Sequence, residues 1–194
     1  EALLTSRCTI TVGGTELWFE PEATPRAVGT GDATHFGPLV GASPSMRRLY
    51  DKLRTIAPTD LSVLVTGETG TGKELVARAV HEASARASGP FVVVDCAALP
   101  TGLAESILFG HERGSFTGAD RARPGAFRQA HGGTIFLDEL AELPEVAQPK
   151  LLRAVAERAV KPVGGRAYQP ADVRIVAATR RDLRREVNCK RFRD

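Results

Sequence analysis

Hydrophobic and polar positions from about residue 36 onward alternate between two periods. Short apolar runs predict buried strands at "LSVLVT", "FVVVDC", "TIFLDE" and "VRIVAAT". Apolar positions at helical spacing predict helices at "SPSMRRLYDKLRTIA", "KELVARAVHEAS" and "VAQPKLLRAVAERAV", with Ser43 or Ser45 as the cap of the first helix. Glycines predict a hairpin around "VGGRAY". Strands that alternate with helices favour parallel pairing, so the pattern predicts an α/β domain with a parallel central sheet.

The N-terminal part of the chain has a different pattern. "CTITVGG" and "TELWFEPE" are two short runs of β-branched and aromatic residues that meet at Gly13-Gly14, which is typical of a hairpin. The stretch "PEATPRAVGTGDATHFG" that follows has the Pro, Gly and Thr content of a linker. We therefore expect the remnant of a β-rich domain at residues 1–20, a linker at 21–35 and an α/β domain at 36–194.

Charge and cysteine content narrow the class of protein. The 26 Lys and Arg residues exceed the 23 Asp and Glu residues by only three, which gives little reason by itself to expect nucleic-acid binding. Cys8, Cys96 and Cys189 are widely spaced and odd in number, so they indicate neither a disulfide framework nor a zinc site. No apolar run approaches the roughly 20 residues of a membrane span. We expect a soluble cytoplasmic protein without a membrane partner.

"GETGTGKE" fits the phosphate-binding pattern G-x-x-x-x-G-K between an apolar strand and a helix. The glycines let backbone N–H groups surround phosphate oxygens, and the helix N-terminus adds positive potential. The alternative is a glycine-rich turn with a surface lysine. Glu74 stands where a Ser or Thr hydroxyl would ordinarily bind Mg²⁺. The candidate nucleotide-binding residues are Gly67, Glu68, Thr69, Gly70, Thr71, Gly72, Lys73 and Glu74.

"GGTIFLDEL" predicts a strand that ends in two carboxylates, Asp138 and Glu139. Ligands bind at the carboxyl edge of a parallel sheet, so Asp138 can hold Mg²⁺ and Glu139 can polarise the attacking water. Alone, the pair could be an ordinary polar loop entry. Together with the upstream glycine loop it indicates an NTPase that uses ATP and Mg²⁺. Phosphoryl transfer also benefits from a cation, and "CKRFRD" offers Lys190, Arg191 and Arg193, unless it is a solvated basic tail.

"GHERGSFTGADRA" places Phe116 in a polar loop with a glycine on each side. Gly114 and Gly118 are suited to be hinges. A phenylalanine at a loop tip needs a partner, so the loop is either a contact surface for another molecule or a loop that packs on itself.

These three motifs together resemble the AAA+ ATPase domain of bacterial sigma-54-dependent transcriptional activators, the enhancer-binding proteins of the NtrC type. The resemblance runs from Phe36 to the last residue and implies a P-loop NTPase with a three-layer αβα architecture. The family's G-A-F-T-G-A loop contacts sigma-54 and remodels the closed complex of the RNA polymerase holoenzyme. The matching residues here are Gly114, Ser115, Phe116, Thr117, Gly118 and Ala119, with Ser115 in place of an alanine.

The resemblance also implies roles for single residues. Lys73 would bind phosphate, Asp138 Mg²⁺ and Glu139 the attacking water. Thr179 matches a sensor threonine, Arg193 matches the first of two arginine fingers that act across a subunit boundary, and Val40 and Gly41 fall where relatives pack against adenine.

Three positions depart from the family pattern. Asp95 lies where many relatives have an asparagine that hydrogen-bonds the catalytic glutamate, and an ionised Asp95 cannot donate that bond. Arg180 replaces a sensor asparagine, and Pro162 replaces a frequent arginine. We expect nucleotide binding to survive these changes, while sensing is altered.

Relatives assemble as rings, which by resemblance are hexamers, and carry a helical lid and a DNA-binding domain after the part matched here. We therefore expect this chain to be an incomplete domain with weak hydrolysis on its own, and to reach DNA only through a further domain. The N-terminal hairpin resembles the closing strands of a forkhead-associated domain. The alternatives are an AAA+ ATPase with another client, which would lack "GSFTGA", and a nucleotide-dependent scaffold with weak or no hydrolysis, against which Lys73, Asp138 and Glu139 argue.

Overall fold

A computed structural model describes residues 8–12, 15–19 and 33–193. β1 (Cys8–Val12) and β2 (Thr15–Phe19) pair antiparallel, with Val12 opposite Thr15, so the two strands of the predicted hairpin are present. Most of the predicted linker lies outside the described residues. His35, its last residue, already pairs with Val40. The assignment of residues 1–20 to a forkhead-associated domain stays a prediction.

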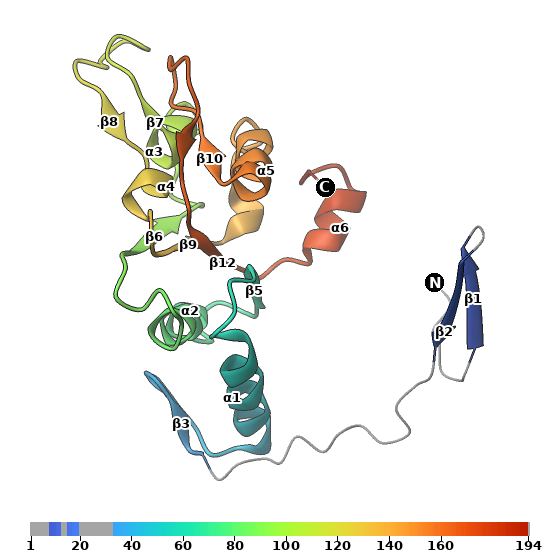
Figure 1. Ribbon diagram of the computed structural model, residues 1–194. Helices are drawn as coiled ribbons and strands as arrows, with labels where there is room; N and C mark the ends of the chain where they lie inside the picture. The colour runs from blue at the N-terminus through green and yellow to red at the C-terminus, as the bar shows by residue number, and fades with distance from the viewer. Residues whose placement is uncertain (1–7, 13–14, 20–32, 194) are drawn as a thin grey trace.

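Four parallel strands form the central sheet in the order β5, β12, β9 and β6 (Figure 1). Their bounds are Val63–Thr66 for β5, Arg174–Thr179 for β12, Thr134–Asp138 for β9 and Phe91–Asp95 for β6. All four run in the same direction, so the loops that follow them meet at one edge of the sheet. The predicted parallel α/β fold is confirmed.

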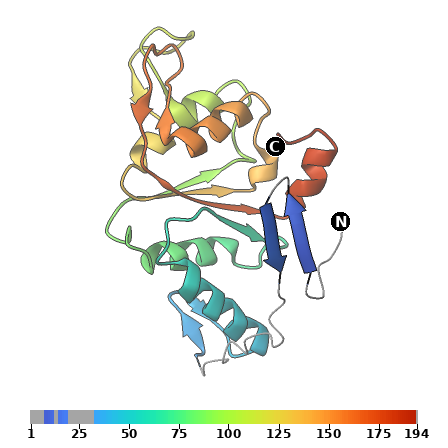
Figure 2. The ribbon, with the colours of Figure 1, turned by 45° about the vertical axis from the view of Figure 1, so that its right-hand side comes forward.

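Helices cover both faces of this sheet (Figures 1 and 2). α1 (Pro44–Ile56) and α2 (Lys73–Glu82) lie on one face, and α3 (Ala104–Phe109), α4 (Ala126–Gln129) and α5 (Gln148–Glu157) lie on the other. Alternation along β9 separates two cores. Phe136 packs with Tyr50 and Val80 on the first face, whereas Ile135 and Leu137 pack with the helices of the second. The three-layer αβα architecture follows directly from this alternation.

The structure confirms one local prediction and contradicts another. Ser43 caps α1, because its side chain accepts a hydrogen bond from Met46 N at 3.3 Å, and Pro44 occupies the first turn. The prediction that β5 is fully buried is wrong, since Leu64 is 47% exposed. β5 lies at the edge of the described sheet, and only the face that carries Val63 and Val65 packs against α1 and α2.

Short elements complete the described part of the chain. β3 (His35–Phe36) pairs with β4 (Leu39–Val40), β7 (Gly110–His111) pairs with β8 (Arg123–Pro124), and β10 (Ala159–Val160) pairs with β11 (Gln169–Pro170). The β10–β11 pair confirms the predicted glycine-turned hairpin. A 3₁₀ helix, η1 (Leu140–Glu142), follows β9, and α6 (Leu183–Asn188) follows β12. None of the helices described has the length and hydrophobicity that crossing a bilayer requires.

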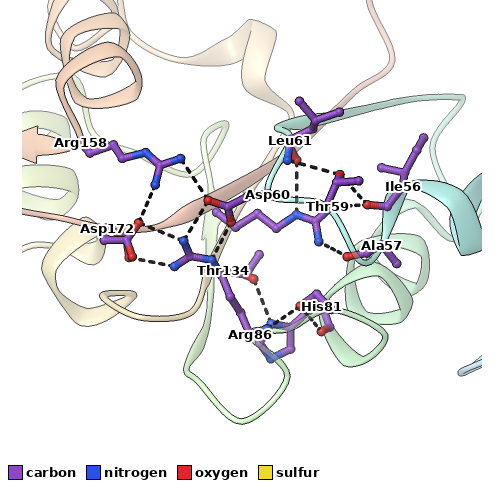
Figure 3. Close-up of polar contacts among 12 residues, drawn as sticks. Ile56, Ala57, Thr59, Asp60, Leu61, His81, Arg86, Thr134, Arg158 and Asp172 are labelled. Carbon is purple, nitrogen blue, oxygen red and sulfur yellow. Dashed lines mark hydrogen bonds and ion pairs between the residues drawn. The ribbon is translucent and has the colours of Figure 1, made fainter.

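A polar network fastens the amino ends of the strands, at the edge opposite the carboxyl ends (Figure 3). Arg86 forms ion pairs with Asp60 and Asp172, and Arg158 bridges the same two carboxylates. The hydrogen bonds from Arg86 hold the pKa of both aspartates below their usual range. Beside this network, the buried His81 Nδ1 lies 2.9 Å from Thr134 Oγ1, and burial lowers the pKa of the imidazole. The segments that carry Asp60, Arg86, Arg158 and Asp172 are far apart in sequence and are thereby joined at the amino edge of the sheet.

Candidate functional site

The glycine loop connects β5 directly to α2, as the sequence predicts. Gly70 and Gly72 have φ of 82° and 83°, a left-handed conformation that favours glycine and lets the chain turn tightly before the helix. Lys73 is the first residue of α2 and is only 8% exposed. Its Nζ donates to the carbonyl oxygens of Gly67 and Glu68 at 3.1 and 3.0 Å. The lysine ammonium therefore lies inside the curve of the loop.

The carboxylate pair stands beside this lysine. Glu139 Oε1 lies 3.5 Å from Lys73 Nζ, and its Oε2 accepts a hydrogen bond from Arg180 N at 3.2 Å. Glu139 has φ 47° and ψ 51°, a left-handed conformation that is unusual outside glycine and that is found preferentially at functional sites. Glu139 N in turn donates to Asp138 Oδ1 at 3.0 Å. β9 thus delivers both carboxylates to the mouth of the glycine loop.

Thr179 ends β12 and is fully buried. Its carbonyl oxygen accepts a hydrogen bond from Gly67 N at 3.3 Å, so it is attached to the first residue of the glycine loop. Its Oγ1 accepts a second bond from Arg181 N at 3.0 Å. The predicted sensor threonine therefore connects the phosphate loop to the segment that follows β12.

Asp95 lies next to Asp138 in the register of the sheet. Its Oδ1 accepts hydrogen bonds from Ala97 N and Ala98 N at 2.9 and 3.3 Å, the pattern of an Asx turn. Its carboxylate therefore holds its own loop, while Glu139 contacts Lys73 and Arg180. Burial, assisted by the negative charges of Asp95, Asp138 and Glu139, raises the pKa of the Cys96 thiol to about 12.

The donor set at this edge fits a magnesium ion that is held mainly by phosphate. Glu74 is engaged elsewhere, because Arg78 donates to its Oε1 at 2.8 and 3.1 Å. Within the described ranges no group of three His, Cys, Asp or Glu side chains could hold a metal alone. Mg²⁺ usually takes one or two carboxylates together with substrate phosphates and water, and Asp138 matches that requirement.

Val40 and Gly41 lie where β4 meets α1 and α2. Leu39 is buried with Val76 and Val80 of α2, and the neighbouring Val40 is 82% exposed. Gly41 is held by a hydrogen bond from its N to Thr34 O and by one from Tyr50 Oη to its carbonyl oxygen. An exposed apolar side chain beside the helix that begins with Lys73 suits a flat aromatic base.

The loop from Gly114 to Ala119 extends from the β7–β8 pair, at the end of the molecule away from α1 (Figures 1 and 2). It is closed by a hydrogen bond from Gly114 N to Ala119 O at 2.8 Å, and Ala119 N donates to Phe116 O at 3.0 Å. The Phe116 ring meets the edge of His111 with a centroid distance of 5.0 Å, and its side chain is still 36% exposed. Phe116 therefore has a partner within the chain and an exposed surface.

A second loop supports this one. The segment between β10 and β11 runs alongside β7, where Val163 N donates to Gly110 O and Glu112 N donates to Val163 O at 2.8 and 2.9 Å. A Cβ at Gly164 would lie 2.7 Å from Ser115 Cβ, so the two loops touch. Pro162 lies in this second loop, where its carbonyl oxygen accepts from Gly165 N.

Arg193 lies on another side of the site, after α6, and is exposed. Its main-chain N donates a hydrogen bond to Gln148 Oε1 at 2.9 Å. Three residues that sequence reasoning missed connect this region with Glu139. Glu142 lies in η1, the turn that follows Glu139. Arg181 forms an ion pair with Glu142 at 2.7 Å. Gln148 is the first residue of α5. Nothing in the local sequence separates them from ordinary polar surface residues, because their partners lie far along the chain.

Comparison with known proteins matches residues 39–194 to the sigma-54 interaction domain family. The transcriptional regulatory protein ZraR of Klebsiella oxytoca is 53% identical over 161 residues, which are 83% of this chain and 36% of that relative. The chain thus spans about a third of the length of that relative.

Solved structures agree with the fold. NtrX from Brucella abortus in complex with ATP superposes with a TM-score of 0.74 and 39% identity, over 80% of this chain and 33% of that one. The P-loop NTPase domain of the sigma-54 transport activator from E. coli superposes with a TM-score of 0.50 and 20% identity, over 77% of this chain and 84% of that one. The second likeness confirms the P-loop NTPase fold.

Proposed function

Because this chain belongs to the sigma-54 interaction domain family, we propose that it hydrolyses ATP with Mg²⁺ and uses the Gly114–Ala119 loop to contact sigma-54 RNA polymerase holoenzyme and remodel the closed promoter complex. One observation carries the proposal. Lys73, Glu139 and the glycine loop meet at the carboxyl edge of a parallel sheet, with Lys73 Nζ 3.5 Å from the Glu139 carboxylate. The Lys73 ammonium, which can bind phosphate, therefore lies beside the Glu139 carboxylate, which can act as a base toward water.

The chemistry would divide among the residues of this edge. Backbone N–H groups of the glycine loop and the N-terminus of α2 would bind the phosphates, and Lys73 would exchange its carbonyl partners for phosphate oxygens. Asp138 would hold Mg²⁺, which supplies positive charge to the phosphates when it is bound. Glu139 would orient and polarise the attacking water once the ammonium of Lys73 turns to phosphate. Thr179, attached to Gly67 through its carbonyl oxygen, would report on the γ-phosphate.

The output surface would be the loop that carries Phe116. Burial of a phenylalanine contributes about 1.5–3 kcal/mol, so one loop would grip sigma-54 weakly and several loops of a ring would act together. Arg193 would complete the site of a neighbouring subunit, which requires self-association into a ring. This role would place the protein in the bacterial cytoplasm, with DNA contacted through other domains.

The catalytic part of the proposal is tested with Glu139→Gln in the protein expressed from its complete natural reading frame. We expect ATP turnover to fall by about 10²–10⁴-fold while nucleotide still binds, because the base is lost and the phosphate cradle is kept. Turnover equal to that of the unaltered protein would show that Glu139 does not activate water. Binding without turnover in the unaltered protein would favour the nucleotide-dependent scaffold.

The contact part is tested with Phe116→Ala in the same protein. We expect near-normal ATP hydrolysis and loss of the complex that sigma-54 forms in the presence of a transition-state mimic of ATP. Since Phe116 lies on the β7–β8 loop and not at the glycine loop, its effect should be confined to capture. Undiminished capture would exclude the loop as the sigma-54 contact.

A further inference from the structure

One buried amide fixes the segment that carries Arg193. Gln148 is only 2% exposed and uses both ends of its side chain. Its Oε1 accepts from Arg193 N at 2.9 Å, and its Nε2 donates to Leu143 O at 3.0 Å. Leu143 directly follows η1, the turn that Glu139 begins. Gln148 therefore joins the end of the catalytic turn to the main chain of the candidate arginine finger.

The rest of the Arg193 segment is folded back on α6. Lys190 has a left-handed φ of 57°, and Glu186 O then accepts from both Arg191 N and Phe192 N at 2.9 and 3.3 Å. Phe192 packs against the core cluster that includes Leu151 and Ala154 of α5. With Phe192 inserted and Arg193 N bonded to Gln148, the main chain is held while the Arg193 side chain remains exposed. The exposed Arg193 side chain therefore extends from a main chain that is held in place.

A chain of ion pairs also connects η1 with α6, and it passes through the buried Glu186. Glu142 of η1 pairs with Arg181 at 2.7 Å, Arg181 lies 3.7 Å from Glu186, and Glu186 pairs with Arg191 at 2.7 Å. Ion pairs of exposed arginines contribute little individually. The hydrogen bond from Gln148 Nε2 to Leu143 O is buried and harder to replace, because its loss would leave the carbonyl oxygen without a partner.

We propose that Gln148 is a positioning residue that couples the turn after Glu139 to Arg193, so that the state of one nucleotide site sets the placement of the arginine offered to the next subunit. The inference rests on the proposed function. A movement of η1 when the phosphate changes would move Leu143 O, the Gln148 amide and Arg193 N together. Placement matters, since a displacement of about 1 Å can cost about 10²-fold in rate.

Gln148→Leu tests this role, because leucine is apolar, of similar size and makes neither hydrogen bond. In the protein expressed from its complete natural reading frame, we expect ATP turnover to fall about tenfold or more while affinity for a fluorescent ATP analogue is unchanged. Gln129→Leu is the matched control, since Gln129 is exposed and its amide donates to the carbonyl oxygen of Pro124, away from Arg193. Gln148→Met, with thermal melting of both variants, serves if the leucine variant does not fold.

Mixed assemblies separate positioning of Arg193 from damage to the variant's own site. Glu139→Gln subunits still bind nucleotide and keep Arg193 but lack the base, so mixing them with Gln148→Leu subunits should restore turnover, as mixing with Arg193→Ala subunits should. If the Arg193→Ala mixture recovers and the Gln148→Leu mixture does not, the positioning role is overturned and the proposed function stands. If Arg193→Ala alone has normal turnover, Arg193 is no arginine finger and both the coupling and that part of the proposed function fail.

Discussion

Arg174 offers the sharpest test of what holds this domain together. It opens β12, is 2% exposed, and donates to the carbonyl oxygens of Ala57, Ile56 and Leu61 at 2.6, 3.0 and 3.3 Å. These carbonyls lie at and just after the C-terminus of α1, where the helix dipole is negative. Burial lowers the pKa of the guanidinium. The positive charge of the buried guanidinium is thus balanced by the dipoles of these backbone carbonyls at the amino end of β12, next to the network in Figure 3.

The cost of Arg174→Met follows from which carbonyls lose their donor. Ile56 O keeps a bond from Thr59 N at 3.0 Å, whereas the recorded bonds of the Ala57 and Leu61 carbonyl oxygens come from Arg174. The Ala57 oxygen is buried, and leaving it without a partner costs about 1–3 kcal/mol, whereas Leu61 is 65% exposed, so water can replace the donor of its carbonyl oxygen. Removal of a buried cation offsets part of that loss. We expect a net destabilisation of about 2 kcal/mol.

Urea unfolding followed by circular dichroism measures this change. With a slope of about 2 kcal/mol per M, the midpoint should fall by about 1 M at an unchanged slope. Arg184→Met is the matched control, because Arg184 is exposed on α6 and should shift the midpoint little. A midpoint for Arg174→Met equal to that of the control, or above that of the unaltered protein, would refute the reasoning and show that burying the cation costs more than its bonds return.

Two further predictions concern the loop and acid stability. Gly164→Ala imposes a left-handed φ of 74° on alanine, at about 1–2 kcal/mol, and places a Cβ 2.7 Å from Ser115 Cβ. The Gly164→Ala variant should capture sigma-54 more weakly while its ATP turnover persists. The control is Gly102→Ala, where nothing lies within 4 Å of the added Cβ. Equal capture by both variants would contradict the contact between the loops. Hydrogen bonds from Arg86 lower the pKa of Asp60 and Asp172, so their stabilisation is present above the unfolded pKa of about 4 and is lost as the pH falls through the lower folded values. Urea midpoints between pH 7 and pH 3 should therefore drop more steeply for the unaltered protein than for Arg86→Met, and parallel curves would exclude the network as the cause.

Much of the candidate site could be predicted because its signals are local. The glycine loop, Lys73 and the Asp138-Glu139 strand end each occupy a few consecutive residues between recognisable elements. Once the strands are parallel, their carboxyl ends must meet at one edge, so the loop and both carboxylates were expected to lie together. The structure brings Lys73, Glu139 and Thr179 to that edge.

Contacts between distant segments had no such local signal. Phe116 was expected to need a partner, and the structure supplies His111 from β7, the strand that precedes its loop. β5 was expected to be buried, yet its position at the edge of the described sheet leaves Leu64 exposed. The Asp95 carboxylate turned to its own loop, and Arg180 reached Glu139 through its main chain, which no side-chain substitution reveals.

The amino-acid sequence by itself determined the strand and helix pattern, the phosphate cradle and the strand that carries the two carboxylates, because periodicity and short motifs act within a few residues. The tertiary structure alone decided the joints between them: Arg174 under the end of α1, Gly164 against Ser115, and Gln148 between Leu143 and Arg193. Each joint pairs a polar or small residue with backbone or with a loop brought near by the packing of the two cores. A hydrogen bond depends on distances of a few tenths of an ångström, and only the complete fold sets those distances.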